Sequence, residues 1–520
     1  MLCVGSNTVE VKASNGIDAS KVYGVEMFWN NSMAVNDVTV SKDGNYIAAV
    51  NDTGLYYFAL NNSNPKWWYL PQLNTSFMSV RVSADGEYVV AGTSDTYLYY
   101  FNDSRVRSGR QIFSTWSTNV GDSVEKEMLD MSDNGEYVVV RARDGVADLY
   151  YFAGCRGRSG TSEAPTWHNS FNVIDFRAVL ISSDGRYVAV AATNYTKGNF
   201  VYFYKDANVT PYPTNPSWIA TTSLNTPIGD LALSDDGYAV VAVDEYVALY
   251  YWANATALSG MLWPNATWMN PGIFWRVDIS DDGSNVVTAS SVHFWANARE
   301  RQRNQTEDWV KLESVGVWDV AISEDGRIIA APTGAETYFF KSDGSIIGKF
   351  NLPQCCFFVS MSGNGSIIAV GNYIHHGLYV FKTLEDSTPP LIEDVYQQPA
   401  NDIVFPDDEV MVYANVTDDQ SGVKHVILSY TTDNETWFIS NMTNLEGNKW
   451  NATIRAFPYC TNVRYMIIAE DYANNTITTE EMGYTYQYHV IPEFPSLIIP
   501  PLFIIATLLA VIVYRRKNSR

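Results

Sequence analysis

The alternation of apolar and polar positions repeats as a block through residues 20–386. Each block has an apolar strand that ends in serine, a turn of the form x-Asp/Asn-Gly, and a second strand of three or four apolar residues. Gly accepts the positive φ of a hairpin turn and Asn or Asp tolerates it, so each block predicts a tight turn between two strands. The eight turns are Ser41-Lys-Asp-Gly44, Ser83-Ala-Asp-Gly86, Ser132-Asp-Asn-Gly135, Ser182-Ser-Asp-Gly185, Ser234-Asp-Asp-Gly237, Ser280-Asp-Asp-Gly283, Ser323-Glu-Asp-Gly326 and Ser362-Gly-Asn-Gly365.

A third strand with an aromatic signature follows each turn, as in Leu55-Tyr-Tyr-Phe58, and Trp116 or Trp218 is typical of a fourth. We interpret the rings as packing between twisted sheets. The turn glycines lie 39 to 52 residues apart, which is the size of a four-stranded propeller blade. The last block lacks a fourth strand, and residues 22–29 supply one before the first block. The sequence therefore predicts an all-β chain with an eight-bladed β-propeller at 20–386, closed by an N-terminal strand.

These Ser-x-Asp-Gly hairpins resemble the repeats of WD-repeat-like propellers over about 365 residues. The resemblance implies an architecture that binds proteins, peptides, sugars or cofactors, and it does not choose among them. Quinoprotein dehydrogenases also have eight blades, but only residues 341–350 resemble their docking signature, once and imperfectly. We therefore predict no cofactor.

Residues 388–487 carry short strands without the blade period, which favours a small β-sandwich. Segments such as Thr388-Pro-Pro-Leu-Ile392 and Ala469-Glu-Asp-Tyr-Ala-Asn474 resemble Ig-like or fibronectin-type modules of prokaryotic surface proteins. The resemblance implies a spacer that carries the propeller. Its acidic turns offer calcium ligands or are simply solvated, and we predict no metal site. The acidic residues are Asp418, Asp419, Asp433 and Asp471.

The C-terminal segment has three parts: a proline-rich stalk at 488–496, an uncharged run at 497–514 and a basic tail at 515–520. An 18-residue helix covers roughly 27 Å, so we expect a transmembrane helix with its basic tail in the cytoplasm. The order resembles the PEF-CTERM signal of archaeal surface proteins, with Pro492, Glu493 and Phe494 as its motif. That resemblance implies an archaeosortase as a partner and lipid in place of the helix; an ordinary anchor is the alternative.

Charge and glycosylation motifs agree with an extracellular location at the cell surface. The net charge of −23 excludes nucleic acid as a partner, since phosphate requires the opposite sign. The chain has 16 Asn-x-Ser/Thr sites, an excess that predicts a glycoprotein. Export also requires a signal peptide, which Met1 to Asn7 do not supply, so we expect a leader before this chain; a tail-anchored cytoplasmic protein is the alternative. The main candidate asparagines are Asn194, Asn208, Asn254, Asn265, Asn304, Asn434 and Asn451.

Arginines gather in the loops between the third and fourth strands of three blades. Equivalent loops emerge on one face of a propeller, so we predict an anion-binding face for an envelope polysaccharide or an acidic surface protein. The alternative is solvated loops with local counter-charges. The arginines are Arg105, Arg107, Arg110, Arg156, Arg158, Arg299, Arg301 and Arg303.

Catalytic motifs are not found in the sequence. The six histidines form no metal-binding or hydrolase pattern, and neither a nucleophile elbow nor a phosphate loop occurs. We therefore predict a non-enzymatic surface protein whose propeller serves recognition, adhesion or envelope interactions. The alternative is an extracellular propeller enzyme, either a lyase, a glycosidase or a quinoprotein dehydrogenase, with a site assembled from carboxylates at the central opening.

Overall fold

The structure is a computed structural model of the whole chain, which divides into two compact units at 1–384 and 385–520. It describes residues 21–71, 75–143, 147–171, 175–194, 198–222, 227–244, 247–262, 266–302, 306–352, 358–374, 376–492 and 499–517.

The first unit is all β, and its described strands form eight sheets of four or five strands. The first four sheets follow one another along the chain, and the strands of each are named here from the inner strand outward. They are β2 (Asp37–Val40), β3 (Tyr46–Val50), β4 (Leu55–Ala59), β5 (Trp67–Tyr69) and β9 (Gly109–Gln111); β6 (Phe77–Val82), β7 (Val89–Thr93), β8 (Tyr97–Phe101) and β10 (Trp116–Asn119); β11 (Leu129–Met131), β12 (Tyr137–Arg143), β13 (Ala147–Ala153) and β14 (Trp167–Phe171); β15 (Asp175–Ile181), β16 (Val188–Asn194), β17 (Gly198–Tyr204), β18 (Trp218–Thr221) and β22 (Gly260–Leu262).

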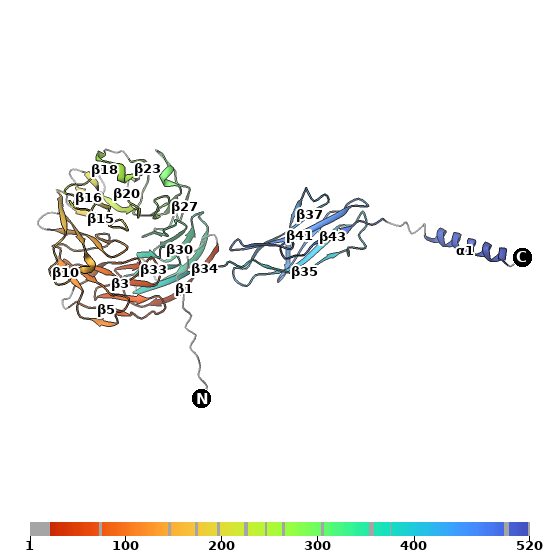
Figure 1. The fold of residues 1–520 in the computed structure, drawn as a ribbon, viewed down its shortest axis with the longest axis horizontal. Coiled ribbons are helices and arrows are strands. Elements are labelled where there is room, and N and C mark those ends of the chain that lie inside the picture. Colours follow the sequence, from red (N-terminus) through yellow and green to blue (C-terminus); the bar gives the residue numbers. More distant parts are fainter. Residues whose placement is uncertain are drawn as a thin grey trace, which may run out of the picture. The chain divides into compact units, whose positions relative to one another are not determined.

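The other four sheets repeat the same order of inner to outer strands. They are β19 (Ile228–Leu233), β20 (Val240–Asp244), β21 (Ala248–Trp252) and β23 (Trp268–Pro271); β24 (Arg276–Ile279), β25 (Val286–Ala289), β26 (Val292–Trp295) and β27 (Trp309–Lys311); β28 (Ala321–Ile322), β29 (Ile328–Pro332), β30 (Glu336–Lys341) and β31 (Ile346–Asn351); β32 (Phe358–Met361), β33 (Ile367–Asn372), β34 (Gly377–Glu385) and β1 (Val22–Asn31). Figure 1 shows these sheets in succession around a ring.

The eighth sheet joins the two ends of the first unit, because β1 is hydrogen-bonded to β34. The Trp29 indole in β1 also donates a hydrogen bond to the Leu60 carbonyl in the first sheet, at 2.6 Å. Val22 is fully buried in the same apolar cluster as Ile328 and Phe381. The N-terminal strand therefore covers the outer edge of the last sheet, which would otherwise present unpaired backbone groups.

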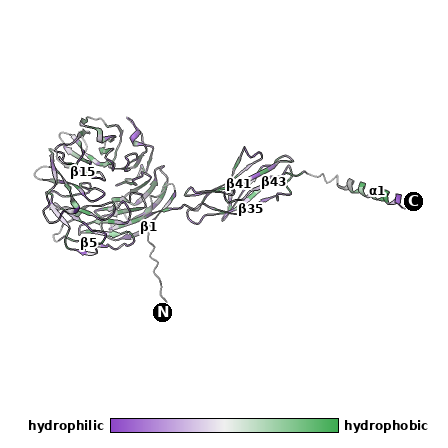
Figure 2. Cartoon of the chain, in the orientation of Figure 1, coloured by the Kyte–Doolittle hydropathy of each residue, from purple (hydrophilic) through white to green (hydrophobic). Residues whose placement is uncertain are grey.

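The core of the first unit lies between neighbouring sheets. Figure 2 shows hydrophobic residues along the strands of both units. Aromatic rings of neighbouring sheets meet there, as Trp167 of the third sheet and Tyr204 of the fourth do with ring centroids 5.6 Å apart. The prediction that the aromatic strands fill the space between blades agrees with this packing.

The second unit contains two antiparallel sheets. They are β35 (Leu391–Gln398), β36 (Val410–Thr417), β40 (Lys449–Ile454) and β39 (Thr443–Glu446), and β38 (Phe438–Asn441), β37 (Val423–Thr431), β41 (Asn462–Asp471) and β42 (Thr476–Thr478), with β43 (Tyr486–His489) also paired to β41. Val412 and Ile454 from one sheet and Leu428 and Ile467 from the other belong to one buried cluster. The two sheets therefore enclose a common core.

A helix, α1 (Ile499–Lys517), follows the second unit's strands and ends in three cations. No helix of the described part of the chain is long and apolar enough to cross a membrane, so the predicted span at 497–514 is not borne out.

Candidate functional site

The eight Ser-x-Asp/Asn-Gly turns are built alike and surround a channel. In each turn the serine hydroxyl donates to the Asp or Asn side chain at 2.6–2.9 Å, and the glycine has φ between 67° and 77°. This local network leaves the residue at the x position free to point toward the axis. Seven of the eight x residues line a cavity of about 330 Å³: Lys42, Ala84, Asp133, Ser183, Asp235, Glu324 and Gly363.

Backbone hydrogen bonds run from turn to turn around this cavity. The N–H groups of Ala84, Asp133, Asp235, Asp281 and Glu324 each donate to the carbonyl of the next x residue. The first turn is joined to the second by the N–H of Asp43, which donates to the Ala84 carbonyl, and the fourth to the fifth by the Ser183 hydroxyl, which donates to the Asp235 carbonyl. Gly363 of the last turn donates to Lys42 of the first at 2.9 Å. The turns therefore close into a continuous circle, which places side chains from distant blocks opposite one another.

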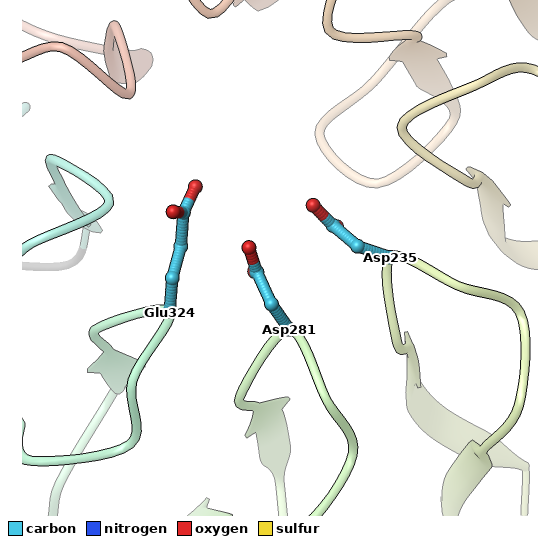
Figure 3. Close-up of side chains that lie close together, drawn as sticks. All are labelled: Asp235, Asp281 and Glu324. Carbon is cyan, nitrogen blue, oxygen red and sulfur yellow. The ribbon is translucent and has the colours of Figure 1, made fainter.

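Lys42 lies among four carboxylates at this mouth of the channel. Its Nζ atom is 2.9 Å from Glu324, 3.0 Å from Asp133 and 3.5 Å from Asp281, and it also pairs with Asp235. Figure 3 shows Asp235, Asp281 and Glu324 projecting from three neighbouring turns toward one another. Their nearest oxygens lie within 4.8 Å of one another, and Lys42 supplies positive charge to that cluster.

The pKa values at this mouth follow from burial and from the crowding of charge. Burial and the neighbouring Asp235 raise the pKa of Asp281 to about 9. Burial acts to lower the pKa of Lys42, but Asp235, Asp133 and Asp281 outweigh it and raise that pKa. The ammonium of Lys42 therefore stays charged at neutral pH, while Asp281 holds a proton.

A second set of charges lies deeper in the channel. Arg81 is 3.0 Å from Asp37, 3.5 Å from Asp130 and 3.8 Å from Glu127. Lys126 is 2.6 Å from Asp319 and 3.6 Å from Glu127. These pairs join side chains from the first, second, third and seventh sheets across the channel.

Five channel carboxylates also accept a backbone N–H from the inner strand of the next sheet, at 2.9–3.1 Å. An inner strand is a sheet edge, and these carboxylates satisfy donors that the edge leaves unpaired. Burial raises the pKa of Asp130 to about 6, of Asp278 to about 7 and of Asp230 to about 8. The five are Asp37, Asp130, Asp230, Asp278 and Asp319.

The deeper set lines a second cavity of about 280 Å³. Arg81, Asp278 and Ser360 line both cavities, so the two are parts of one channel. Its acidic side chains outnumber its lysines and arginines ten to four. The acidic residues are Asp37, Glu127, Asp130, Asp133, Asp230, Asp235, Asp278, Asp281, Asp319 and Glu324, and the cations are Lys42, Arg81, Lys126 and Arg276.

Carboxylates at the central opening were predicted only as part of the enzyme alternative, without naming the residues that form the channel. The x position of the turn was treated as variable, although Lys42, Asp133, Asp235, Asp281 and Glu324 make it charged in five of eight blocks. The residues two and four positions before the turn serine hold most of the deeper charges. Charged residues inside otherwise apolar inner strands were the signal that could have located the channel.

The loop arginines of the predicted anion-binding face have local partners. Arg105 pairs with Glu87, Arg156 with Glu136 at 2.6 Å and Arg299 with Asp236 at 2.7 Å. Arg107, Arg158 and Arg301 each donate to the carbonyl five residues earlier, at 2.7–2.9 Å. Arg110 is exposed in β9, and Arg303 lies outside the described residues. These contacts give six of the arginines a structural role, and anion binding stays a prediction.

The other candidate residues differ in exposure. Asn254 and Asn434 are exposed and Asn208 and Asn451 are half-buried, whereas Asn194 is buried in β16 with 6% exposure. A buried side chain has no room for a glycan, so Asn194 is a poor candidate in the folded chain. Asn265, Asn304, Glu493 and Phe494 lie outside the described residues, while Pro492 is described and half-buried.

Two of the acidic turn residues of the second unit come together with a third. Oxygens of Asp386, Asp418 and Asp471 lie within 4.8 Å of one another. Asp433 instead accepts hydrogen bonds from backbone N–H groups of Thr436 and Glu435, which lower its pKa to about 2. Asp419 does not join the cluster.

Comparison with known proteins identifies the fold class as a WD40-like β-propeller. The structure resembles the crystal structure of the C-terminal WD40 domain of Sif2, with a TM-score of 0.53 and 12% sequence identity, over 69% of this chain and 99% of that one. No family model matches the sequence, and no curated protein matches it. The prediction of an all-β, WD-repeat-like propeller is confirmed at the level of the fold.

Proposed function

We propose that this chain is a non-catalytic recognition protein of the cell surface, built on an eight-bladed propeller that its N-terminal strand closes. A WD40-like propeller fold is compatible with a protein-interaction scaffold, and the acidic channel is the feature through which this chain would recognise a partner. The partner is a surface protein or an envelope polysaccharide. The second unit, with its Ig-like sequence segments, acts as a spacer.

One observation carries this proposal: the channel charges are engaged with one another and with the backbone. Asp37, for example, accepts N–H groups from Val38 and Val80 and pairs with Arg81. A carboxylate that joins neighbouring sheets through such contacts is itself held rigidly. A rigid charged surface favours selective binding. The carboxylate excess gives this surface a negative field that attracts cationic groups.

The experiment measures binding of the full chain to isolated envelopes of the source cells, before and after the double substitution Asp133→Asn and Asp235→Asn. We expect saturable binding that salt weakens and the double variant reduces several-fold. The matched control is the pair Asp402→Asn and Asp407→Asn in the second unit. Equal binding by the unaltered chain, the channel variant and the control variant would show that the channel takes no part in recognition.

Surface location is proposed from the glycosylation motifs and from the C-terminal segment 492–520, through which the chain would be attached to the cytoplasmic membrane after processing by an archaeosortase. Mass spectrometry of purified envelopes should find glycans on the exposed Asn254 and Asn434. Protease added to intact cells should cleave the chain. Unmodified asparagines together with full protection from protease would refute the location.

An extracellular enzyme is the second candidate, and the spread of carboxyl pKa values supports it. Asp130, with a pKa of about 6, and Asp278, with a pKa of about 7, would be able to accept and donate protons at neutral pH. The full chain, incubated with envelope polysaccharides, would then release fragments with a rate that Asp278→Asn abolishes. Intact polysaccharide after prolonged incubation would favour recognition.

A further inference from the structure

Two tryptophans come just before inner strands, at the strand ends opposite the Ser-x-Asp/Asn-Gly turns. Trp275 directly precedes β24 and Trp318 lies three residues before β28, so both stand where an inner strand enters the channel wall. Their ring centroids are 5.8 Å apart with planes inclined at 37°. Trp318 is 44% exposed, and we call this pair the tryptophan rim.

The residues that follow the tryptophan rim along the chain belong to the channel. Asp319 comes directly after Trp318 and lines the deeper cavity. That cavity has five carboxyl groups, from Asp37, Glu127, Asp230, Asp278 and Asp319, and the cations Arg81, Lys126 and Arg276 act on them. The raised pKa values leave Asp230 mostly and Asp278 partly protonated at neutral pH, so Glu127 and Asp319, which pair with Lys126, are the carboxylates that a basic group would meet. Carboxylates and the face of an indole ring both attract a cationic group.

The chain itself already holds an ammonium group here. Lys126 enters from the loop before β11 in the third sheet and crosses to the seventh and eighth sheets. Its Nζ atom is 2.6 Å from Asp319, 3.6 Å from Glu127 and 5.0 Å from the centroid of the Phe358 ring. An arrangement of carboxylates and an aromatic ring around an ammonium is the chemistry that recognises a basic side chain.

We propose that the tryptophan rim and the adjoining carboxylates Glu127 and Asp319 form a docking site for a lysine or arginine side chain of a protein partner, and that Lys126 occupies this site in the free protein. The inference rests on the proposed recognition function and names the chemistry of its partner. Binding exchanges one ammonium for another, so the carboxylates stay compensated. Trp275 and Trp318 then contact the partner residue beside the inserted side chain.

The test uses the full chain and three libraries of eight-residue peptides that share random flanks and carry a central lysine, arginine or norleucine. We expect lysine and arginine libraries to bind at least fivefold more strongly than the norleucine library. Trp318→Ala should reduce that binding at least fivefold. Lys126→Met should increase it several-fold, because it removes the internal competitor.

The controls separate this site from general effects of charge and exposure. Lys349→Met removes a lysine that also has a carboxylate partner, Glu336 at 2.8 Å, and an aromatic ring, Tyr338 at 5.2 Å, but lies on β31 outside the channel. Phe113→Ala removes a ring that is 73% exposed elsewhere. Both should bind the libraries as the unaltered chain does, and thermal unfolding should show that all four variants are folded.

Equal binding of the three libraries, or weaker binding by Lys126→Met, would overturn the proposal. Binding of the polyamine spermine but of no peptide library would overturn the choice of a protein partner. If envelope binding persists and Trp318→Ala leaves it unchanged, the rim proposal fails while the recognition function stands. If the unaltered chain does not bind envelopes, the proposed recognition function itself is refuted.

Discussion

Single tryptophan side chains connect neighbouring sheets of the first unit. In six sheets the indole Nε1 donates to a loop carbonyl of the following sheet at 2.8–3.0 Å, as Trp218 does to Ala255. Tyr57, Tyr100, Tyr151 and Tyr251 similarly donate to the turn glycine carbonyl of the next sheet. From the sequence these rings are expected to act by packing alone. Their hydrogen bonds show that they also fix the position of the next sheet.

Trp218→Phe tests this connection. We expect a loss of about 1–3 kcal/mol in the free energy of unfolding, because the buried Ala255 carbonyl loses its donor. Urea unfolding followed by circular dichroism measures the change. Trp68→Phe is the control, since Trp68 is half-buried and faces the opposite side of its strand from the bonded Trp67. A loss at Trp218 no larger than at Trp68 would contradict the role.

The channel carboxylates predict how stability depends on pH. Burial raises the pKa of Asp278 to about 7 and of Asp230 to about 8, so the folded chain keeps protons that the unfolded chain releases near pH 4. The folded state then binds more protons than the unfolded state, and the stability these groups contribute falls as pH rises toward 7–8. Each of these two aspartates should lower the free energy of unfolding by ~1 kcal/mol per pH unit between pH 5 and 7.

Unfolding free energies of the unaltered chain and of Asp278→Asn at pH 5, 6, 7 and 8 check this expectation. The variant should have a flatter profile than the unaltered chain, because an amide does not titrate. Asp433 is a useful contrast, since hydrogen bonds lower its pKa to about 2 and Asp433→Asn should leave the slope unchanged in this range. A stability that rises with pH from 5 to 8 would show that other groups dominate.

At the scale of elements, β1 decides whether the first unit has free sheet edges. The strand pairs with β34, and its Trp29 makes the same kind of bond to the next sheet as the six tryptophans described above. The closure therefore uses both backbone pairing and a side chain. Short outer strands such as β9 and β22 cover the edges of other sheets in the same manner, by parallel pairing to β5 and β18.

Val22→Ala weakens the packing of this strand without breaking its backbone bonds. We expect a loss of roughly 2 kcal/mol in unfolding free energy, since Val22 is fully buried. Phe28→Ala in the same strand should change it by less, because Phe28 is 43% exposed. Guanidinium unfolding of the full chain gives both values. Similar effects of the two substitutions would mean that β1 contributes little to the first unit.

For the whole molecule the dominant quantity is the net charge of −23. Self-repulsion of this size destabilises a compact chain, and salt screens it over about 10 Å at 0.1 M. The buried channel pairs are screened less than the surface charges. Stability should therefore rise when salt is added, although salt weakens individual surface ion pairs.

Thermal unfolding between 0.05 and 1 M sodium chloride measures this effect. We expect the midpoint to rise by several degrees, on the order of 1–2 kcal/mol of stabilisation for a chain of this size. Sucrose at matched viscosity is the control for effects unrelated to charge. A midpoint that falls with salt would show that ion pairs such as Lys42 with Glu324 outweigh the repulsion.

The sequence by itself determined the strands, the turns and the class of fold. Asp-Gly and Asn-Gly turns and apolar alternation act over a few residues, so the eight blocks could be found without knowing what surrounds them. The use of residues 22–29 as a last strand followed from the missing fourth strand of the final block. Local patterns of this kind need no information about distant contacts.

Only the tertiary structure decided which charged residues meet. Lys42 and Glu324 are 282 positions apart, and Lys126 and Asp319 are 193 apart, yet each pair is in contact. Closing a ring brings the x positions and inner strands of all blocks to one axis. The sequence does not indicate which of their side chains then come into contact. The same holds for the loop arginines, whose neutralising partners come from the adjacent turns, because electrostatic interactions depend on distances through space.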